Sequence, residues 1–104
     1  MATSRLEVLK SMVAQNPADK LARYGLAMEY RSAGDLEAAA AEFHALLEAH
    51  PDYGGAYFHY GQTLLRAGRK DEAREVYRQG IEVTGRLGNS HARSELEGAL
   101  EMLE

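Results

Sequence analysis

The chain has 104 residues, 45% of them hydrophobic, with no cysteine and a formal net charge of −4 at pH 7. This length fits one domain, the composition is too apolar for a disordered chain, and the lack of cysteine excludes disulfides and thiolate chemistry. Because nucleic-acid binding favours an excess of basic residues, the acidic balance argues against a nucleic-acid partner.

The first predicted element is a helix over residues 4–15 that ends at Asn16 and Pro17. This segment lacks the continuous apolar run and small-residue cleavage site of a secretory signal. No run in the chain approaches the ~18 apolar residues needed to span a bilayer. We therefore expect a cytoplasmic protein without a membrane partner. The apolar face of this first helix carries Leu6, Leu9, Met12 and Val13.

A helical hairpin is predicted next, from helices over residues 18–33 and 36–49. Gly34 stands between them, where a glycine tolerates the left-handed conformation that ends a helix. Asp35 is placed to cap the second helix. The small residues Ala27 and Ala39 let the two helices approach closely. Pro51 then closes the unit.

A second hairpin is predicted from helices over residues 54–67 and 70–83, with Gly68 between them. Arg69 occupies the position of Asp35 and cannot cap the following helix. Gly61 and Ala73 stand where the first hairpin has Ala27 and Ala39. Gly85 replaces a closing proline, which predicts that the last helix of this hairpin continues toward Leu87.

The final predicted helix covers residues 90–103, with Ser90 as its N-cap. Its apolar face carries Leu96, Leu100 and Leu103, and we expect these leucines to cover the side of the second hairpin that would otherwise be exposed. The whole chain is thus predicted to form six helices.

A shift of 34 residues superposes Lys20–Tyr53 on Gly54–Leu87 without a gap. The period, the glycine turn, the small-residue pair, the late aromatic residue and the closing proline resemble the tetratricopeptide repeat. The chain is also similar to short bacterial proteins with two such repeats. The resemblance implies an all-α superhelix, with residues 1–104 as a single domain made of a helix over 4–15, repeats over 20–53 and 54–87 and a capping helix over 90–103. Five identities between the two units support this register: Ala22, Ala33, Gly34, Ala39 and Glu48 fall on Ala56, Ala67, Gly68, Ala73 and Glu82.

The sequence predicts neither catalysis nor a bound metal or cofactor. No two of the four histidines have the i, i+3 or i, i+4 spacing that would place two metal ligands on one helical face. His91 and Glu95 are four residues apart, which fits a surface side-chain pair. A phosphate-binding glycine loop and a nucleophile elbow are both absent from the sequence.

By the resemblance, the first helix of each hairpin lines a concave face that binds a peptide or protein segment. Such a face suits a ligand of apolar and acidic character. Repeats that grip the C-terminal carboxylate of heat-shock chaperones use a set of Lys, Asn and Arg residues, of which this chain matches only Arg93. The candidate peptide-binding residues are Leu21, Tyr24, Met28, Arg31, Phe58, Gln62, Leu65, Arg66 and Arg93.

Two alternatives stay open for this surface. Phe58, Leu65 and Leu96 could instead pack on one another or under the closing helix. The chain could also associate with itself as a homo-oligomer, because the first repeat is rich in acidic residues and the second in basic ones. The tyrosines Tyr30, Tyr57, Tyr60 and Tyr77 are expected in the core rather than on a base-stacking platform.

Overall fold

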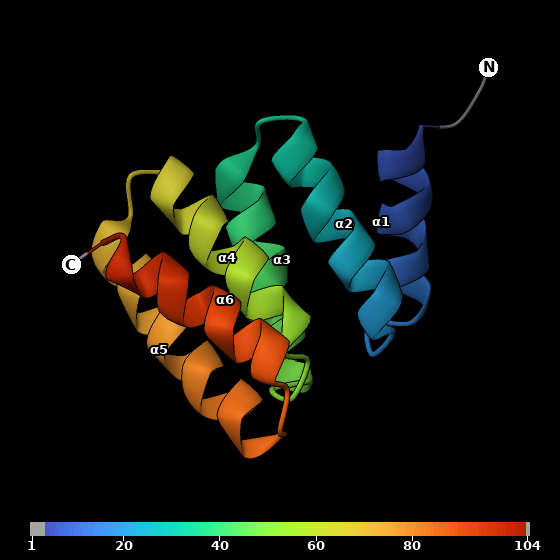
Figure 1. The fold of residues 1–104 in the computed structure, drawn as a ribbon. Coiled ribbons are helices and arrows are strands. Elements are labelled where there is room, and N and C mark those ends of the chain that lie inside the picture. Colours follow the sequence, from blue (N-terminus) through green and yellow to red (C-terminus); the bar gives the residue numbers. More distant parts are fainter. Residues whose placement is uncertain (1–3, 104) are drawn as a thin grey trace. The chain divides into compact units, whose positions relative to one another are not determined.

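The computed structural model describes residues 4–103, and these residues form helices and no strands. The all-α prediction is confirmed. The described chain divides into two compact units, unit 1 ending at His50 and unit 2 beginning at Pro51. The single domain expected over residues 1–104 stays a prediction, and residues 1–3 and 104 lie outside the described part. In chain order the helices are α1 Arg5–Gln15, α2 Lys20–Ser32, α3 Leu36–Ala49, α4 Gly55–Arg66, α5 Lys70–Arg86 and α6 Ser90–Glu101 (Figure 1).

Each helix of unit 1 begins at a side chain that accepts a backbone N–H. Ser4 Oγ accepts from Glu7 at 3.1 Å, and Asp35 Oδ1 accepts from Ala38 at 3.2 Å. Asp19 Oδ1 accepts from two N–H groups of the first turn of α2. These bonds satisfy donors that a helix start leaves without partners, and they confirm the predicted cap at Asp35.

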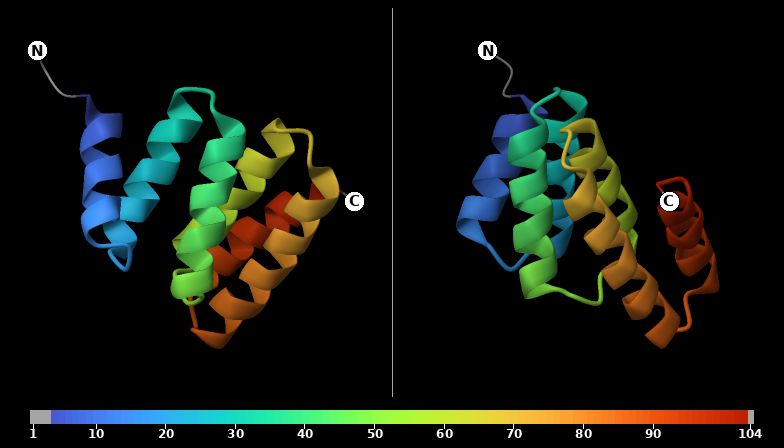
Figure 2. Two further views of the ribbon diagram at one scale, coloured as in Figure 1. Left: turned by 180° about the vertical axis from the view of Figure 1, so that it is seen from behind. Right: turned by 90° about the vertical axis from the view of Figure 1, so that its left-hand side faces the viewer.

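The hairpin of unit 1 is formed by α2 and α3, which run antiparallel, with α1 packed on α2 (Figures 1 and 2). Ala27 of α2 and Ala39 of α3 are completely buried, as expected for small residues at a close helix approach. Phe43 is also fully buried. On the other side of α2, a Cβ at Gly25 would stand 3.1 Å from Cδ2 of Leu9, so Gly25 permits the close approach of α1.

In unit 2, α4 and α5 pack around Tyr77, which is 1% exposed. A Cβ at Gly61 would stand 2.2 Å from a carbon of the Tyr77 ring. Gly61 therefore makes room for an aromatic ring, whereas the sequence suggested only a close approach of two backbones. As predicted, α5 continues past Val83 to Arg86, and the chain then turns at Gly88, whose φ is +73°.

The closing helix α6 packs on α5 and α4 (Figure 2). Leu96 is 1% exposed and would touch a Cβ placed at Gly80, so the glycine of α5 receives this leucine. Leu100 and Leu103 are half-buried. The predicted cap at Ser90 is wrong. Asn89 Oδ1 accepts from Ala92 N–H at 3.2 Å, so Asn89 is the N-cap and Ser90 is the first residue of the helix. Both side chains suit this role, and the turn at Gly88 positions Asn89 for it.

The tyrosines expected in the core divide into two groups. Tyr57 and Tyr77 are buried, and Tyr30 and Tyr60 are half-buried. None of the described helices has the length and apolar character needed to cross a bilayer.

Candidate functional site

The four candidate residues of unit 1 all lie on α2. Contacts with the two neighbouring helices, α1 and α3, determine which side of α2 faces solvent. Arg23 forms an ion pair with Glu42 of α3 at 2.7 Å, and Arg5 of α1 forms one with Glu29 at 2.9 Å. These contacts occupy two sides of α2. Leu21 lies elsewhere on the helix and is 69% exposed.

The other α2 candidates are less exposed than Leu21. Tyr24, Met28 and Arg31 are half-buried. The Tyr24 ring meets the Phe43 ring edge-on, with centroids 6.2 Å apart and planes at 76°. Tyr24 thus contributes to the core of unit 1 and also presents part of its surface to solvent. Leu21 is the apolar candidate with the most surface left for a partner.

The candidates of unit 2 follow the same pattern on α4. Phe58 is half-buried, and its ring meets His59 edge-on at a centroid distance of 5.7 Å. Gln62 and Leu65 are half-buried, and Arg66 is exposed. The structure therefore brings together four candidates in each unit, on the first helix of each hairpin.

Three of these positions repeat after 34 residues, in the register of the sequence repeat. Each pair has one member on α2 and one on α4, and all six side chains are half-buried. The exposure of these positions is thus a property of both repeats. The pairs are Tyr24 with Phe58, Met28 with Gln62, and Arg31 with Leu65.

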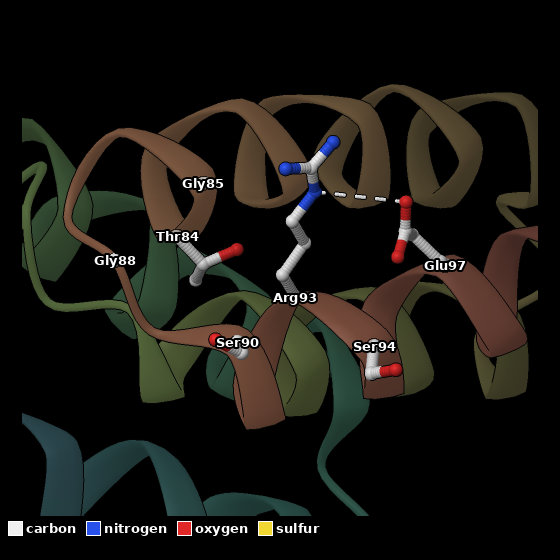
Figure 3. A pocket seen from close by; sticks show the side chains of 7 residues that line it. All are labelled: Thr84, Gly85, Gly88, Ser90, Arg93, Ser94 and Glu97. Carbon is white, nitrogen blue, oxygen red and sulfur yellow. Dashed lines mark ion pairs between the residues drawn. The ribbon is translucent and has the colours of Figure 1, made fainter.

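Arg93 differs from the other candidates in its position: it lies on α6, and its guanidinium lies over α5. A Cβ at Gly85 would stand 3.2 Å from Nη1 of Arg93. Nε of Arg93 is 3.6 Å from Oε2 of Glu97, and both side chains are about half exposed at 51%. Arg93 lines a groove of about 290 Å³ between the end of α5 and α6 (Figure 3). The lining residues are Thr84, Gly85, Gly88, Ser90, Arg93, Ser94 and Glu97.

The sequence analysis missed this groove. Ser90, Arg93, Ser94 and Glu97 fall at i, i+3, i+4 and i+7, which places them along one side of α6. That polar spacing is the available signal in the sequence.

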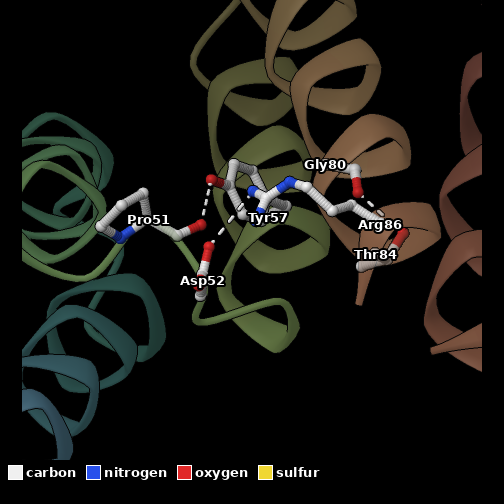
Figure 4. Close-up of polar contacts among 6 residues, drawn as sticks. All are labelled: Pro51, Asp52, Tyr57, Gly80, Thr84 and Arg86. Atoms are coloured by element: carbon white, nitrogen blue, oxygen red, sulfur yellow. Dashed lines mark hydrogen bonds and ion pairs between the residues drawn. The ribbon is translucent and has the colours of Figure 1, made fainter. Parts of the chain in front are cut away.

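The segment that precedes α4 is held against α4 and α5 by two polar contacts (Figure 4). The Tyr57 hydroxyl donates to the carbonyl oxygen of Pro51 at 2.6 Å, and Arg86 forms an ion pair with Asp52 at 3.2 Å. Burial raises the pKa of the Tyr57 phenol, the Asp52 carboxylate raises it further, and the Arg86 guanidinium lowers it. These contacts fix the beginning of the helix that carries Phe58 and Arg66.

Among the described residues, no group of three or more His, Asp or Glu side chains is arranged to hold a metal ion. Each of the helices α2 and α4 carries apolar side chains and an arginine, a combination suited to noncovalent contact with another chain.

Comparison with known proteins places this architecture in a family. The tetratricopeptide repeat model matches residues 24–92, which is more than half of the chain. A TPR repeat-containing protein of Pseudomonas aeruginosa is 30% identical over 95% of this chain and 94% of its own. The solution structure of a tetratricopeptide repeat domain protein from Salinibacter ruber has 39% identity and a TM-score of 0.80, covering 86% of this chain and 90% of that one.

A solution structure of a Bordetella parapertussis protein has 27% identity and a TM-score of 0.83, over 98% of this chain and 89% of that one. The repeat period, the helix order and these matches agree with one another, and the chain belongs to the tetratricopeptide repeat family.

Proposed function

We propose that this chain is a non-catalytic interaction module that binds a segment of another protein through the exposed sides of α2 and α4. Proteins of this fold generally act as protein–protein interaction modules. The observation that carries the proposal is the shared exposure of equivalent positions on α2 and α4. In both repeats these side chains are only half-buried, and apolar surface left open in this way commonly marks an interaction site.

The chemistry of the ligand follows from the side chains on these helices. Leu21, Met28 and Phe58 offer apolar contact, and the flexible thioether of Met28 adapts to different ligand shapes. Arg66 is exposed at the end of α4, where its planar fork can hold a carboxylate. A segment with apolar residues and at least one acidic side chain suits the side chains of these helices best.

The alternative is self-association driven by opposite charge on the two units. Unit 1 has five basic and seven acidic residues, and unit 2 has seven basic and nine acidic residues. The basic character of the second repeat is therefore offset by the acidic closing helix, which leaves both units with the same net charge. This balance supports a separate partner rather than a second copy.

The test begins with crosslinking in native cell extract, after which mass spectrometry identifies the partner. Calorimetry with the purified partner then compares the wild type with Leu21→Ser and with Arg66→Ala. Each variant is expected to weaken binding by at least about tenfold, equivalent to about 1.4 kcal/mol, while the circular dichroism spectrum stays unchanged.

Val8→Ser is the matched control, because Val8 is an exposed apolar residue on α1, a helix that carries none of the candidate residues. Tyr24→Ala is a less specific test because its ring also packs on Phe43. Wild-type affinity in both the Leu21 and Arg66 variants would contradict the proposal. A salt-sensitive dimer in light scattering of the protein alone would favour self-association.

A further inference from the structure

The two compact units of the chain are joined by one short segment, residues 50–54, between α3 and α4. The boundary between the units falls inside this segment, after His50 and before Pro51. Hinges between compact units are commonly a few residues at the ends of helices or strands, which absorb the change in φ and ψ. The contacts on the two sides of this boundary therefore decide how freely the units can reorient.

His50 is held by unit 1 at two points. Its backbone N–H donates to the carbonyl oxygen of Leu46 at 2.8 Å, in the last turn of α3. Its ring Nε2 lies 2.9 Å from the carbonyl oxygen of Ala18, in the turn between α1 and α2. Because a carbonyl oxygen only accepts, Nε2 carries the proton and donates this bond. We call the bond from His50 to Ala18 the His50 anchor.

The residues after the boundary are held by unit 2 (Figure 4). The Tyr57 hydroxyl donates to the carbonyl oxygen of Pro51 at 2.6 Å, and Tyr57 is only 4% exposed, so unit 2 fixes the ring that carries this hydroxyl. We call this bond the Tyr57 anchor. The ion pair between Asp52 and Arg86 adds a contact to α5, which is weaker because both side chains are more than half exposed.

Few torsions remain free between the two anchors. The peptide bond between His50 and Pro51 is planar and the proline ring fixes φ of Pro51, which leaves ψ of His50 and ψ of Pro51. A residue before a proline is kept out of the helical region, so His50 cannot extend α3 into the segment. Each anchor is a single hydrogen bond, which contributes modestly to stability and can open.

The same backbone geometry occurs 34 residues earlier, at a place that does not join the units. Asn16 precedes Pro17 and has φ −142° and ψ 84°, close to the −134° and 70° of His50. The Asn16–Pro17 junction lies inside unit 1. It therefore provides a control in which the same kind of turn is altered without touching the boundary.

We propose that His50–Pro51 is a hinge whose range is limited from both sides, by the His50 anchor in unit 1 and the Tyr57 anchor in unit 2. Opening either anchor frees further torsions and widens the range. The candidate residues on α2 belong to unit 1 and those on α4 to unit 2, so the hinge sets how far the two sets move independently. The hinge needs no ligand and does not rest on the function proposed above.

Residual dipolar couplings of the backbone amides in the full chain test this proposal, because they report the alignment of each unit separately. One alignment tensor is fitted to the helical amides of residues 20–49 and another to those of residues 55–101. The measured quantity is the ratio of the smaller tensor magnitude to the larger, which falls when one unit moves relative to the other. We expect a lower ratio in His50→Ala and in Tyr57→Phe than in the wild type.

Asn16→Ala is the matched control, and its ratio should equal that of the wild type. The same ratio in the wild type and in both anchor variants would overturn the hinge. A lowered ratio in Asn16→Ala would also overturn it, because that change acts at a proline junction inside unit 1. If the couplings in an anchor variant no longer fit the helices of its own unit, the bond stabilises that unit rather than the junction, and the anchor role is wrong.

Discussion

Replacing Gly61 by alanine tests the packing of α4 on α5. The added Cβ would stand 2.2, 2.6 and 2.7 Å from three atoms of the Tyr77 ring. Real Cβ atoms essentially never come this close, so the ring or a helix has to move. Tyr77 is 1% exposed, so its ring is enclosed by other atoms of the protein. Alanine is otherwise the better helix former, by about 1 kcal/mol.

Overpacking of a tight core costs about 1–3 kcal/mol, and the ring contact here falls at the upper end of that range. After the gain in helix propensity is subtracted, we expect Gly61→Ala to lower the free energy of unfolding by about 2 kcal/mol. For a chain of this size that corresponds to a fall in Tm of roughly 8 °C or more. Urea unfolding followed by circular dichroism measures the change.

The matched control is Gly98→Ala on α6. A Cβ at Gly98 meets nothing within 4 Å, so this variant keeps the propensity gain without the clash and should be stabilised by about 0.5–1 kcal/mol. In a Tyr77→Leu background, Gly61→Ala should cost less, because the ring atoms are gone. Equal stability of Gly61→Ala and the wild type would refute the packing argument.

Four further predictions concern the core, the closing helix and the start of α4. Ala39→Leu should cost about 1–3 kcal/mol because Ala39 is completely buried, and an unchanged melting temperature would contradict this packing. Leu96→Ala should cost about 2–5 kcal/mol by opening a cavity under α6. A chain ending at Gly88 should aggregate, so a truncated chain that stays monomeric and melts sharply would disprove the capping role of α6. Because the folded-state pKa of Tyr57 is raised, the free energy of unfolding is retained below about pH 10 and falls as pH rises through the folded pKa. Urea unfolding at several pH values measures this fall. The fall should be smaller in Tyr57→Phe, which has no phenol to ionise.

Much of the fold could be predicted from the sequence, because its signals are local. Gly34 and Gly68 take the left-handed conformation, with φ of 84° and 80°, at the two positions where the pattern required a helix end. The partner of Gly61 could not be predicted, because a small residue indicates a close approach without showing what approaches. The cap of α6 could not be predicted for a related reason: Asn89 and Ser90 can both cap a helix, and the turn before them decides which one does.

The candidate site was predicted in part. The resemblance identified α2 and α4 and the positions on them, since these positions repeat with the period of the sequence. Their partial burial depends on contacts such as that of Tyr24 with Phe43, which no spacing rule gives. The groove at Arg93 is completed by the closing helix, which lies beyond the two superposed repeats, so no repeat comparison could indicate it.

The ion pair between Arg86 and Asp52 joins equivalent positions of the two repeats, 34 residues apart. Two identical copies of a repeat would place the same residue at both ends of this contact. Two aspartates or two arginines would then repel each other where the protein now has an attraction. The difference between the copies at this position is therefore part of the structure, and making the second repeat a duplicate of the first would remove the contact.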